Sequence, residues 1–185
     1  MCYLCEKNPV YEFTNRRKVC KNCFIKYFEK KFLYTIRKYN LIKREERLGY
    51  YEKKDFRSVV LKYLIDYFSS RAGNTILKIT LKNKNTFDKI VLDDTADFVS
   101  KEFFNNILNS DISESKKFSV NYKNNIRPLF LFLDKEVRLY AELKGFKYKE
   151  ISEKKNKVFL YFDELEKKHP EIKTSVISSY LKLFN

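Results

Sequence analysis

The chain has 185 residues, of which 44% are hydrophobic and 34% are charged, and its formal net charge is +15. The hydrophobic content is sufficient for a folded core and excludes an intrinsically disordered chain. The sequence has no run of about 18 apolar residues, which excludes a membrane-spanning helix. It also has no N-terminal signal peptide, so we expect a cytoplasmic protein that does not bind membranes.

All four cysteines lie in the first residues of the chain, as two pairs with the spacings Cys2-x2-Cys5 and Cys20-x2-Cys23. Two such pairs can offer four thiolates to one ion, which is typical of a zinc ribbon. A redox CxxC pair would be expected near a βαβ unit, and an iron–sulfur cluster usually has less regular spacing. Because four thiolates fill a tetrahedral site, we expect one structural Zn²⁺ with no position for a substrate.

A basic amphipathic helix is predicted to follow the ribbon and to complete a first unit over residues 1–47. Its apolar residues recur with the period of a helix. They are Phe24, Phe28, Phe32, Ile36 and Tyr39. The exposed basic side chains predicted to bind nucleic acid are Arg16, Arg17, Lys18, Lys21, Lys26, Lys30, Arg37 and Lys38. Such a cationic surface favours nucleic-acid binding, because neutralised phosphates release counterions. The alternative is the lysine bias of an AT-rich genome.

Residues 48–185 are predicted to form a second unit in which strands and helices alternate. The predicted strands are 48–51, 75–82 and 89–94, and the predicted helices are 55–68, 95–108, 134–144, 158–168 and 174–184. Residues 109–125 are polar, and we predict that they form a connection without regular structure. Gly145 is predicted to end the helix 134–144. Strands separated by helices indicate an α/β domain with a small, mostly parallel sheet.

The second unit offers few groups for catalysis. Asp93 and Asp94 end a predicted strand, and we interpret them as a helix cap or as a vestigial site. The three glycines are isolated, so no glycine-rich loop can bind a phosphate. The single histidine, His169, precedes a proline in a charged run, which is typical of a surface residue. We therefore predict no catalytic residue.

Three segments, in this order, resemble the tRNA 2-thiolation family of PP-loop ATPases, which replace the 2-oxygen of a uridine or cytidine with sulfur. They are CYLC…KVCKNCFIKYFEKKFLYTIRKYNLI, IVLDDTADFVSKEFFNNIL and RPLFLFLDKEVRLYAELKGF. The resemblance covers roughly half of the chain. It implies that residues 48–185 form a truncated Rossmann-like domain of the PP-loop, or adenine nucleotide alpha hydrolase-like, type.

The departures from this family concern its catalytic residues. Catalytic members carry an SGGKDS loop that binds the ATP pyrophosphate, whereas this chain has YEKKDF at 51–56. Lys54 and Asp55 match that loop, but Glu52 and Lys53 stand at its glycine positions, where a carboxylate repels phosphate. The family's central CxxC pair and its catalytic cysteine are missing. The chain thus resembles the non-catalytic second subunit of the eukaryotic cytoplasmic tRNA 2-thiolation complex.

This resemblance implies a pseudoenzyme that binds tRNA and forms a heterodimer with an ATP-using catalytic subunit, which takes sulfur from a ubiquitin-like carrier. The aromatic residues of the predicted helices led us to expect that one face is buried against this partner. Two alternatives are a minimal active tRNA sulfurtransferase and a zinc-ribbon nucleic-acid-binding protein outside the pathway.

Overall fold

The computed structural model describes residues 1–69, 73–80, 86–150 and 157–184 and contains a five-stranded sheet. In spatial order the strands are β4 (Thr75–Lys78), β3 (Arg47–Tyr50), β5 (Lys89–Val91), β7 (Asn125–Ile126) and β6 (Asn121–Tyr122). The first four are parallel, and β6 is antiparallel to β7. The predicted α/β class with a small, mostly parallel sheet is confirmed.

The chain leaves β3 and β5 in opposite directions. After β3 it passes through α2 (Phe56–Ser69) to β4 on one side, and after β5 it passes through α3 (Ala96–Leu108) to β7 on the other. In open α/β sheets, such a switch point at the carboxyl ends of the strands is the usual place for a ligand. The residues after Tyr50 and Val91 therefore meet at this position.

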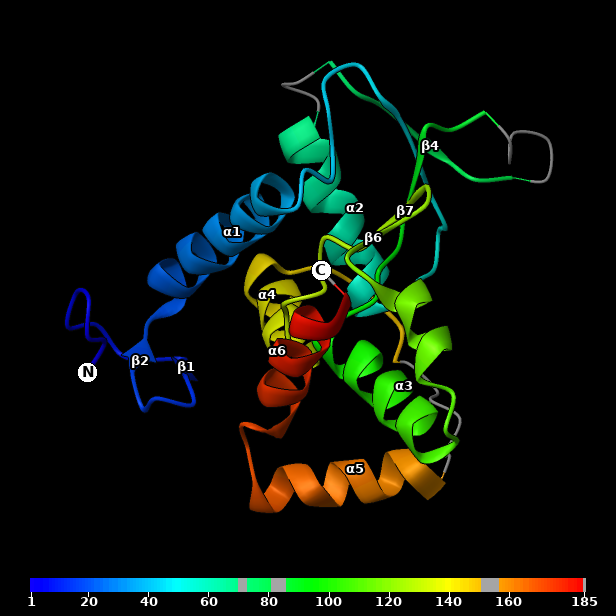
Figure 1. The fold of residues 1–185 in the computed structure, drawn as a ribbon. Helices are drawn as coiled ribbons and strands as arrows, with labels where there is room; N and C mark the ends of the chain where they lie inside the picture. The colour runs from blue at the N-terminus through cyan, green and yellow to red at the C-terminus, as the bar shows by residue number, and fades with distance from the viewer. Residues whose placement is uncertain (70–72, 81–85, 151–156, 185) are drawn as a thin grey trace.

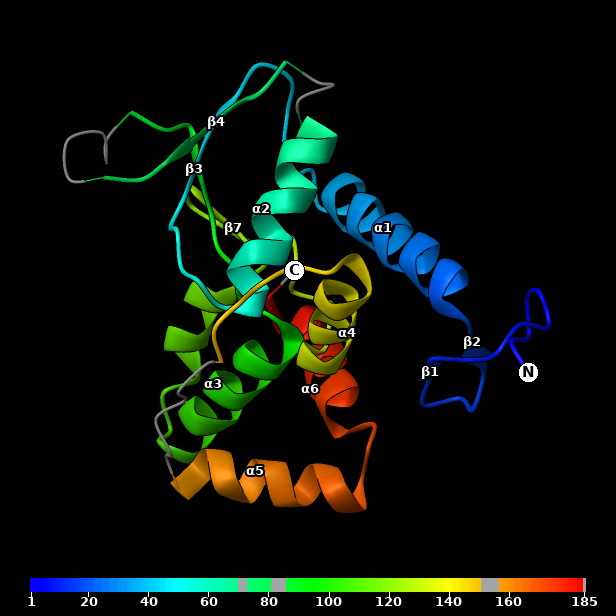
Figure 2. The same ribbon diagram turned by 180° about the vertical axis from the view of Figure 1, so that it is seen from behind.

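Four further helices complete the described part of the chain (Figures 1 and 2). They are α1 (Lys21–Lys38), α4 (Asp134–Lys144), α5 (Lys157–Lys168) and α6 (Ile172–Phe184). Helix α4 packs against α1 and α2, and α5 lies across the ends of α3 and α6. Helix α4 ends at Gly145, which has φ of +73°, as predicted from the sequence. None of the helices in the described part of the chain combines the length and the apolar character needed to cross a bilayer.

Aromatic side chains join the ribbon helix to the rest of the protein. The ring of Phe28 on α1 stacks on Tyr140 of α4 at a centroid distance of 4.2 Å and lies 4.5 Å from Phe132. Phe24, Phe28 and Tyr140 are fully buried within this chain. These three aromatic residues are therefore buried without a partner subunit, whereas Tyr34 of α1 and Tyr67 of α2 are exposed, and burial of one aromatic face against a partner stays a prediction. One hydrophobic cluster contains buried residues from both sides of residue 47. The division of the chain into the units 1–47 and 48–185 stays a prediction.

The segment predicted as a polar connection, 109–125, contains regular structure. A 3-10 helix spans Ile112–Phe118, and β6 begins at Asn121. Polar contacts hold this segment in place: the hydroxyl of Tyr180 on α6 donates a 2.6 Å hydrogen bond to the carbonyl of Ser115. Such contacts produce no periodic pattern of apolar residues, so the sequence did not indicate this structure. Strand β4 is shorter than the predicted strand 75–82, whose last two residues lie outside the described residues.

Candidate functional site

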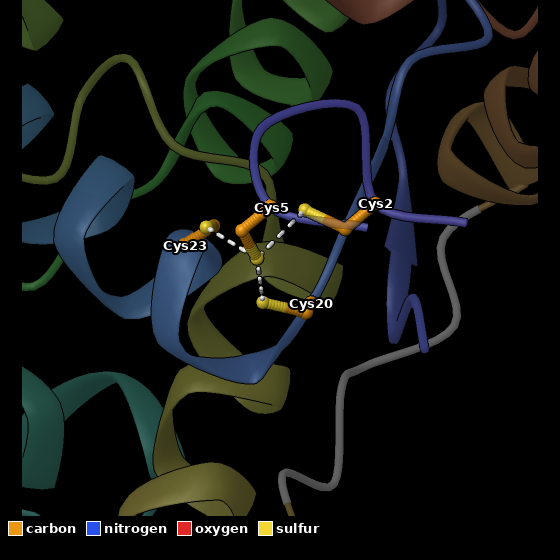
Figure 3. A group of neighbouring side chains, drawn as sticks. All are labelled: Cys2, Cys5, Cys20 and Cys23. Atoms are coloured by element: carbon orange, nitrogen blue, oxygen red, sulfur yellow. Dashed lines mark hydrogen bonds between the residues drawn. The ribbon is translucent and has the colours of Figure 1, made fainter. Parts of the chain in front are cut away.

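The four cysteines converge at the N-terminal end of α1 (Figure 3). The Sγ atom of Cys5 lies 3.7 Å from that of Cys2, 3.4 Å from that of Cys20 and 3.6 Å from that of Cys23. All four Sγ atoms lie within 4.8 Å of one another. These separations are too long for a disulfide, whose S–S bond is about 2.05 Å.

A short hairpin brings the two cysteine pairs together. Strand β1 (Tyr11–Glu12) pairs with β2 (Lys18–Val19), so that Cys20 follows directly after β2. The first pair is held against this hairpin because the amide of Tyr3 donates to the carbonyl of Lys18 at 2.9 Å. Cys20 is the N-cap residue of α1, and Cys23 lies in the first turn of that helix. Each pair therefore sits on a turn whose backbone is fixed.

The geometry of the cysteine cluster fits one tetrahedral ion. With metal–sulfur bonds of about 2.3 Å, four thiolates around one ion stand roughly 3.8 Å apart, close to the separations in this cluster. A four-iron cluster bonds each thiolate to a different iron, which needs sulfur atoms farther apart than those sharing a single ion. Cys2 and Cys20 are buried and Cys5 is exposed. The cluster forms a possible metal site with four protein ligands.

The eight predicted nucleic-acid-binding residues are all exposed. Arg16 and Arg17 lie in the turn between β1 and β2, Lys18 lies on β2, and the other five lie on α1. Lys26, Lys30 and Arg37 share one face of α1, since their spacings are four and seven residues. Lys18 forms a 3.4 Å ion pair with Glu12, and Arg17 lies over the ring of Tyr3. The fold thus gathers these cations on the hairpin and on α1.

The four residues that the resemblance assigns to a degenerate ATP loop, Glu52 to Asp55, connect the end of β3 to α2. The ammonium group of Lys53 forms a 2.7 Å ion pair with Asp93, which follows β5. Burial lowers the pKa of Lys53, but the Asp93 carboxylate outweighs this effect and the pKa stands above its usual value. Glu52 pairs with Lys78 at 2.5 Å, and Asp55 accepts a 3.0 Å hydrogen bond from the amide of Ser58. A lysine–aspartate pair therefore crosses the switch point.

The prediction that Asp93 or Asp94 caps the next helix is wrong, because Thr95 is the N-cap residue of α3. Both carboxylates form ion pairs instead. Asp94 accepts a 2.8 Å bond from the Nε atom of Arg127, and burial raises the pKa of Asp94 although this guanidinium opposes the shift. Asp94 and Arg127 belong to two of the segments that carried the family resemblance. Their role in this fold is to tie β5 to the segment after β7.

Three lysines that we did not predict as site residues lie near the same switch point. Lys62, Lys147 and Lys149 line one pocket together with Lys53 and Lys54. The run EKK at 52–54 and the run KYK at 147–149 are visible in the sequence, but nothing in their spacing indicates that they meet. Only the pairing of these two segments in the fold reveals the group.

Comparison with protein-family models and with curated protein sequences finds no match. Among solved structures, the fold is similar to the U34-tRNA thiolase NcsA from Methanococcus maripaludis, which was determined with its [4Fe-4S] cluster. The TM-score is 0.78 at 19% sequence identity, and the match covers 99% of this chain and 86% of the thiolase chain. At this identity the likeness shows a thiolase-like fold, which confirms the predicted architecture.

Proposed function

We propose that this chain is a non-catalytic, tRNA-binding subunit that supports 2-thiolation of the wobble uridine of cytosolic tRNAs. The thiolase-like fold and the exposed cations of the hairpin and α1 support a role with tRNA. The observation that carries the non-catalytic part is the Lys53–Asp93 ion pair at the ends of β3 and β5. The resemblance puts Lys53 at a glycine position of the ATP loop, so this ion pair supports the loss of the open, glycine-lined loop that phosphate needs.

The chemistry of the remaining residues favours the same interpretation. The chain has four cysteines in total, and all of them belong to the cluster at the start of α1. A thiolate engaged with a metal ion is not available to carry sulfur. Sulfur transfer would need a further nucleophilic thiolate, so the catalytic thiol must come from another protein.

The proposed ion is one structural Zn²⁺ bound by Cys2, Cys5, Cys20 and Cys23. The separations of the Sγ atoms support a single ion, whereas the similar thiolase holds a [4Fe-4S] cluster. Bound zinc would fix the hairpin to the start of α1, since binding free energy in such small modules is largely folding free energy. In this role the ion orients the cations at Arg16 and Arg17.

The proposed partner is the catalytic tRNA 2-thiolation subunit, which uses ATP and takes sulfur from a ubiquitin-like carrier. The family resemblance alone supports this heterodimer, because Phe24, Phe28 and Tyr140 are already buried within this chain. The proposed division of labour is that this chain holds tRNA while its partner activates the uridine.

Reconstitution tests the proposal. Purified tRNA is incubated with ATP and a sulfur donor together with the catalytic subunit alone, this chain alone, or both proteins, and 2-thiouridine is measured by mass spectrometry after digestion. We expect thiolation only when both proteins are present, and no adenylation of tRNA by this chain alone. A variant with Arg17, Lys18 and Lys30 changed to Glu serves as the matched control for tRNA binding.

Each other outcome favours one alternative. Thiolation by this chain alone would refute the non-catalytic role and favour a minimal active sulfurtransferase. Equal thiolation with and without this chain would refute the partner role and favour a nucleic-acid-binding protein outside the pathway.

A further inference from the structure

A pocket of about 440 Å³ lies beside the first turns of α2. Its walls come from the segment after β3, from α2 and from residues 147–149 after α4. The amide of Lys149 donates a 2.7 Å hydrogen bond to the carbonyl of Lys54, which fixes the two segments to each other. Figure 2 shows the chain after α4 crossing beside the N-terminal part of α2. The pocket thus has a defined shape rather than being a gap between loops.

Lysine dominates the charge of this pocket. Lys53, Lys54, Lys62, Lys147 and Lys149 line it together with a single carboxylate, Glu52. Lys53 is paired with Asp93, and Glu52 is paired with Lys78, which does not line the pocket. Within residues 1–69, 73–80, 86–150 and 157–184, the other four lysines form no ion pair with a carboxylate. About four positive charges therefore face one small volume and repel one another, which a bound polyanion would relieve.

The remaining lining is aromatic and apolar. Tyr50 is buried at the end of β3, Tyr148 is half-buried, and Val59 of α2 also lines the pocket. Lys62 lies 5.8 Å from the centre of the Tyr50 ring. The volume falls in the range of pockets that hold small molecules, roughly 300–1,000 Å³. Aromatic rings beside cations are the combination that binds single-stranded nucleic acid, through base stacking and phosphate contacts.

We propose that this lysine pocket binds one unpaired nucleotide of an RNA, with its flanking phosphodiesters on the lysines and its base against the tyrosine wall. The inference rests on the proposed function, because it adds a second RNA contact to the one predicted on the hairpin and α1. Figures 1 and 2 place the hairpin beyond α4 from the segment between β3 and α2. An RNA that reaches both would cross the face of α4. A base can enter the pocket only when it is unpaired, so the pocket selects substrates with an unpaired stretch.

The test neutralises two exposed lysines on the two hydrogen-bonded segments that line the pocket, Lys54→Gln and Lys149→Gln, in one variant. The loss of two phosphate contacts lowers the slope of log K against log salt by about 1.4 for a single strand, and the affinity by about 25-fold at 0.1 M salt. The matched control is Lys167→Gln with Lys168→Gln, an equal change in charge at exposed positions of α5. We expect less than about a twofold effect from it, because these charges contact no phosphate.

The probes are a labelled single-stranded uridine oligonucleotide and, separately, Mg-ATP, with binding followed by anisotropy and calorimetry. The expected result is the 25-fold loss for the oligonucleotide in the pocket variant only. Equal losses in the pocket variant and the α5 control would refute the pocket as a site. Binding of ATP that the pocket variant abolishes, with oligonucleotide binding unchanged, would assign the pocket to a free nucleotide and also refute the inference.

The failure of this inference and the failure of the proposed function give different results. If the oligonucleotide binds and only the variant with Arg17, Lys18 and Lys30 changed to Glu loses affinity, the pocket inference is wrong and the tRNA-binding subunit stands. If the pocket variant loses affinity but the reconstituted thiolation does not depend on this chain, the pocket stands and the proposed pathway role is wrong.

Discussion

Replacing Arg127 by alanine should destabilise the fold more than any exposed charge change. Arg127 is 4% exposed, and its Nε atom bonds to Asp94 at 2.8 Å while its Nη1 atom donates to the carbonyl of Ser119 at 2.9 Å. In the Arg127→Ala variant both acceptors stay in place without their donor. The side chain of Asp94 is 18% exposed, so water can replace the guanidinium only in part.

The magnitude follows from the burial of this ion pair. Removing one partner of a buried pair costs about 3–5 kcal/mol, because an uncompensated charge is left behind. With a urea m-value of about 2 kcal/mol/M, this loss lowers the unfolding midpoint by about 1.5–2.5 M. In contrast, Lys117→Ala breaks the exposed pair with Glu114, for which about 0.2–1 kcal/mol is expected. The control therefore shifts the midpoint by less than about 0.5 M.

The dependence on pH distinguishes a charge effect from a packing effect. Burial already raises the pKa of Asp94, and loss of Arg127 raises it further. The pKa of Asp94 is then higher in the folded state than in the unfolded state. The loss of stability caused by its buried charge is therefore fully present at a pH above the folded-state pKa. It disappears as the pH falls from the folded-state pKa to the unfolded-state pKa, because the carboxyl becomes protonated. The deficit of Arg127→Ala relative to the wild type should therefore be smaller at about pH 5 than at about pH 7.

Urea unfolding followed by far-UV circular dichroism in metal-replete buffer measures both effects. The wild type, Arg127→Ala, Asp94→Asn and the double variant complete the cycle, and the cost of Arg127→Ala should fall in the Asp94→Asn background. A deficit below about 1 kcal/mol at neutral pH, or one that does not change with pH, would show that the pair is not buried as described.

Three further predictions concern the metal, the RNA and the sheet. Cys20→Ser should reduce bound zinc from one equivalent to less than about half and unfold the hairpin, as measured by metal analysis and proteolysis; iron in the wild type would contradict it. Gly49→Ala should cost about 1–3 kcal/mol in urea unfolding, since a Cβ atom there would lie 2.7 Å from Phe87 and 2.9 Å from Ile79; wild-type stability would contradict the close packing around β3. Charge reversal on the hairpin and α1 should weaken tRNA binding and reduce its salt slope by about 0.7–0.9 per lost phosphate contact, and an unchanged slope would move the site elsewhere. The residues reversed to Glu are Arg17, Lys18 and Lys30.

The sequence by itself determined the elements whose signals are local. The spacing of Phe24, Phe28 and Phe32 predicts α1 because a helix places residues four apart on one face, and all three are buried. Gly145 predicts the end of α4, since glycine adopts a left-handed conformation without a steric cost. The two CxxC pairs predict a metal site because each is a tight local turn, and the fold brings the four Sγ atoms together.

Only the tertiary structure decided which distant side chains meet. Asp93 and Asp94 have the same local sequence pattern whether they cap a helix or form ion pairs with basic side chains. They form ion pairs because the fold brings Lys53 and Arg127 to them from other elements. Ion pairs of this kind join residues more than 30 positions apart. They leave no periodic signal in the sequence, because their geometry depends on which strands become neighbours. The same holds for the pocket, which Lys54 and Lys149 line together only because the segment after α4 pairs with the loop after β3.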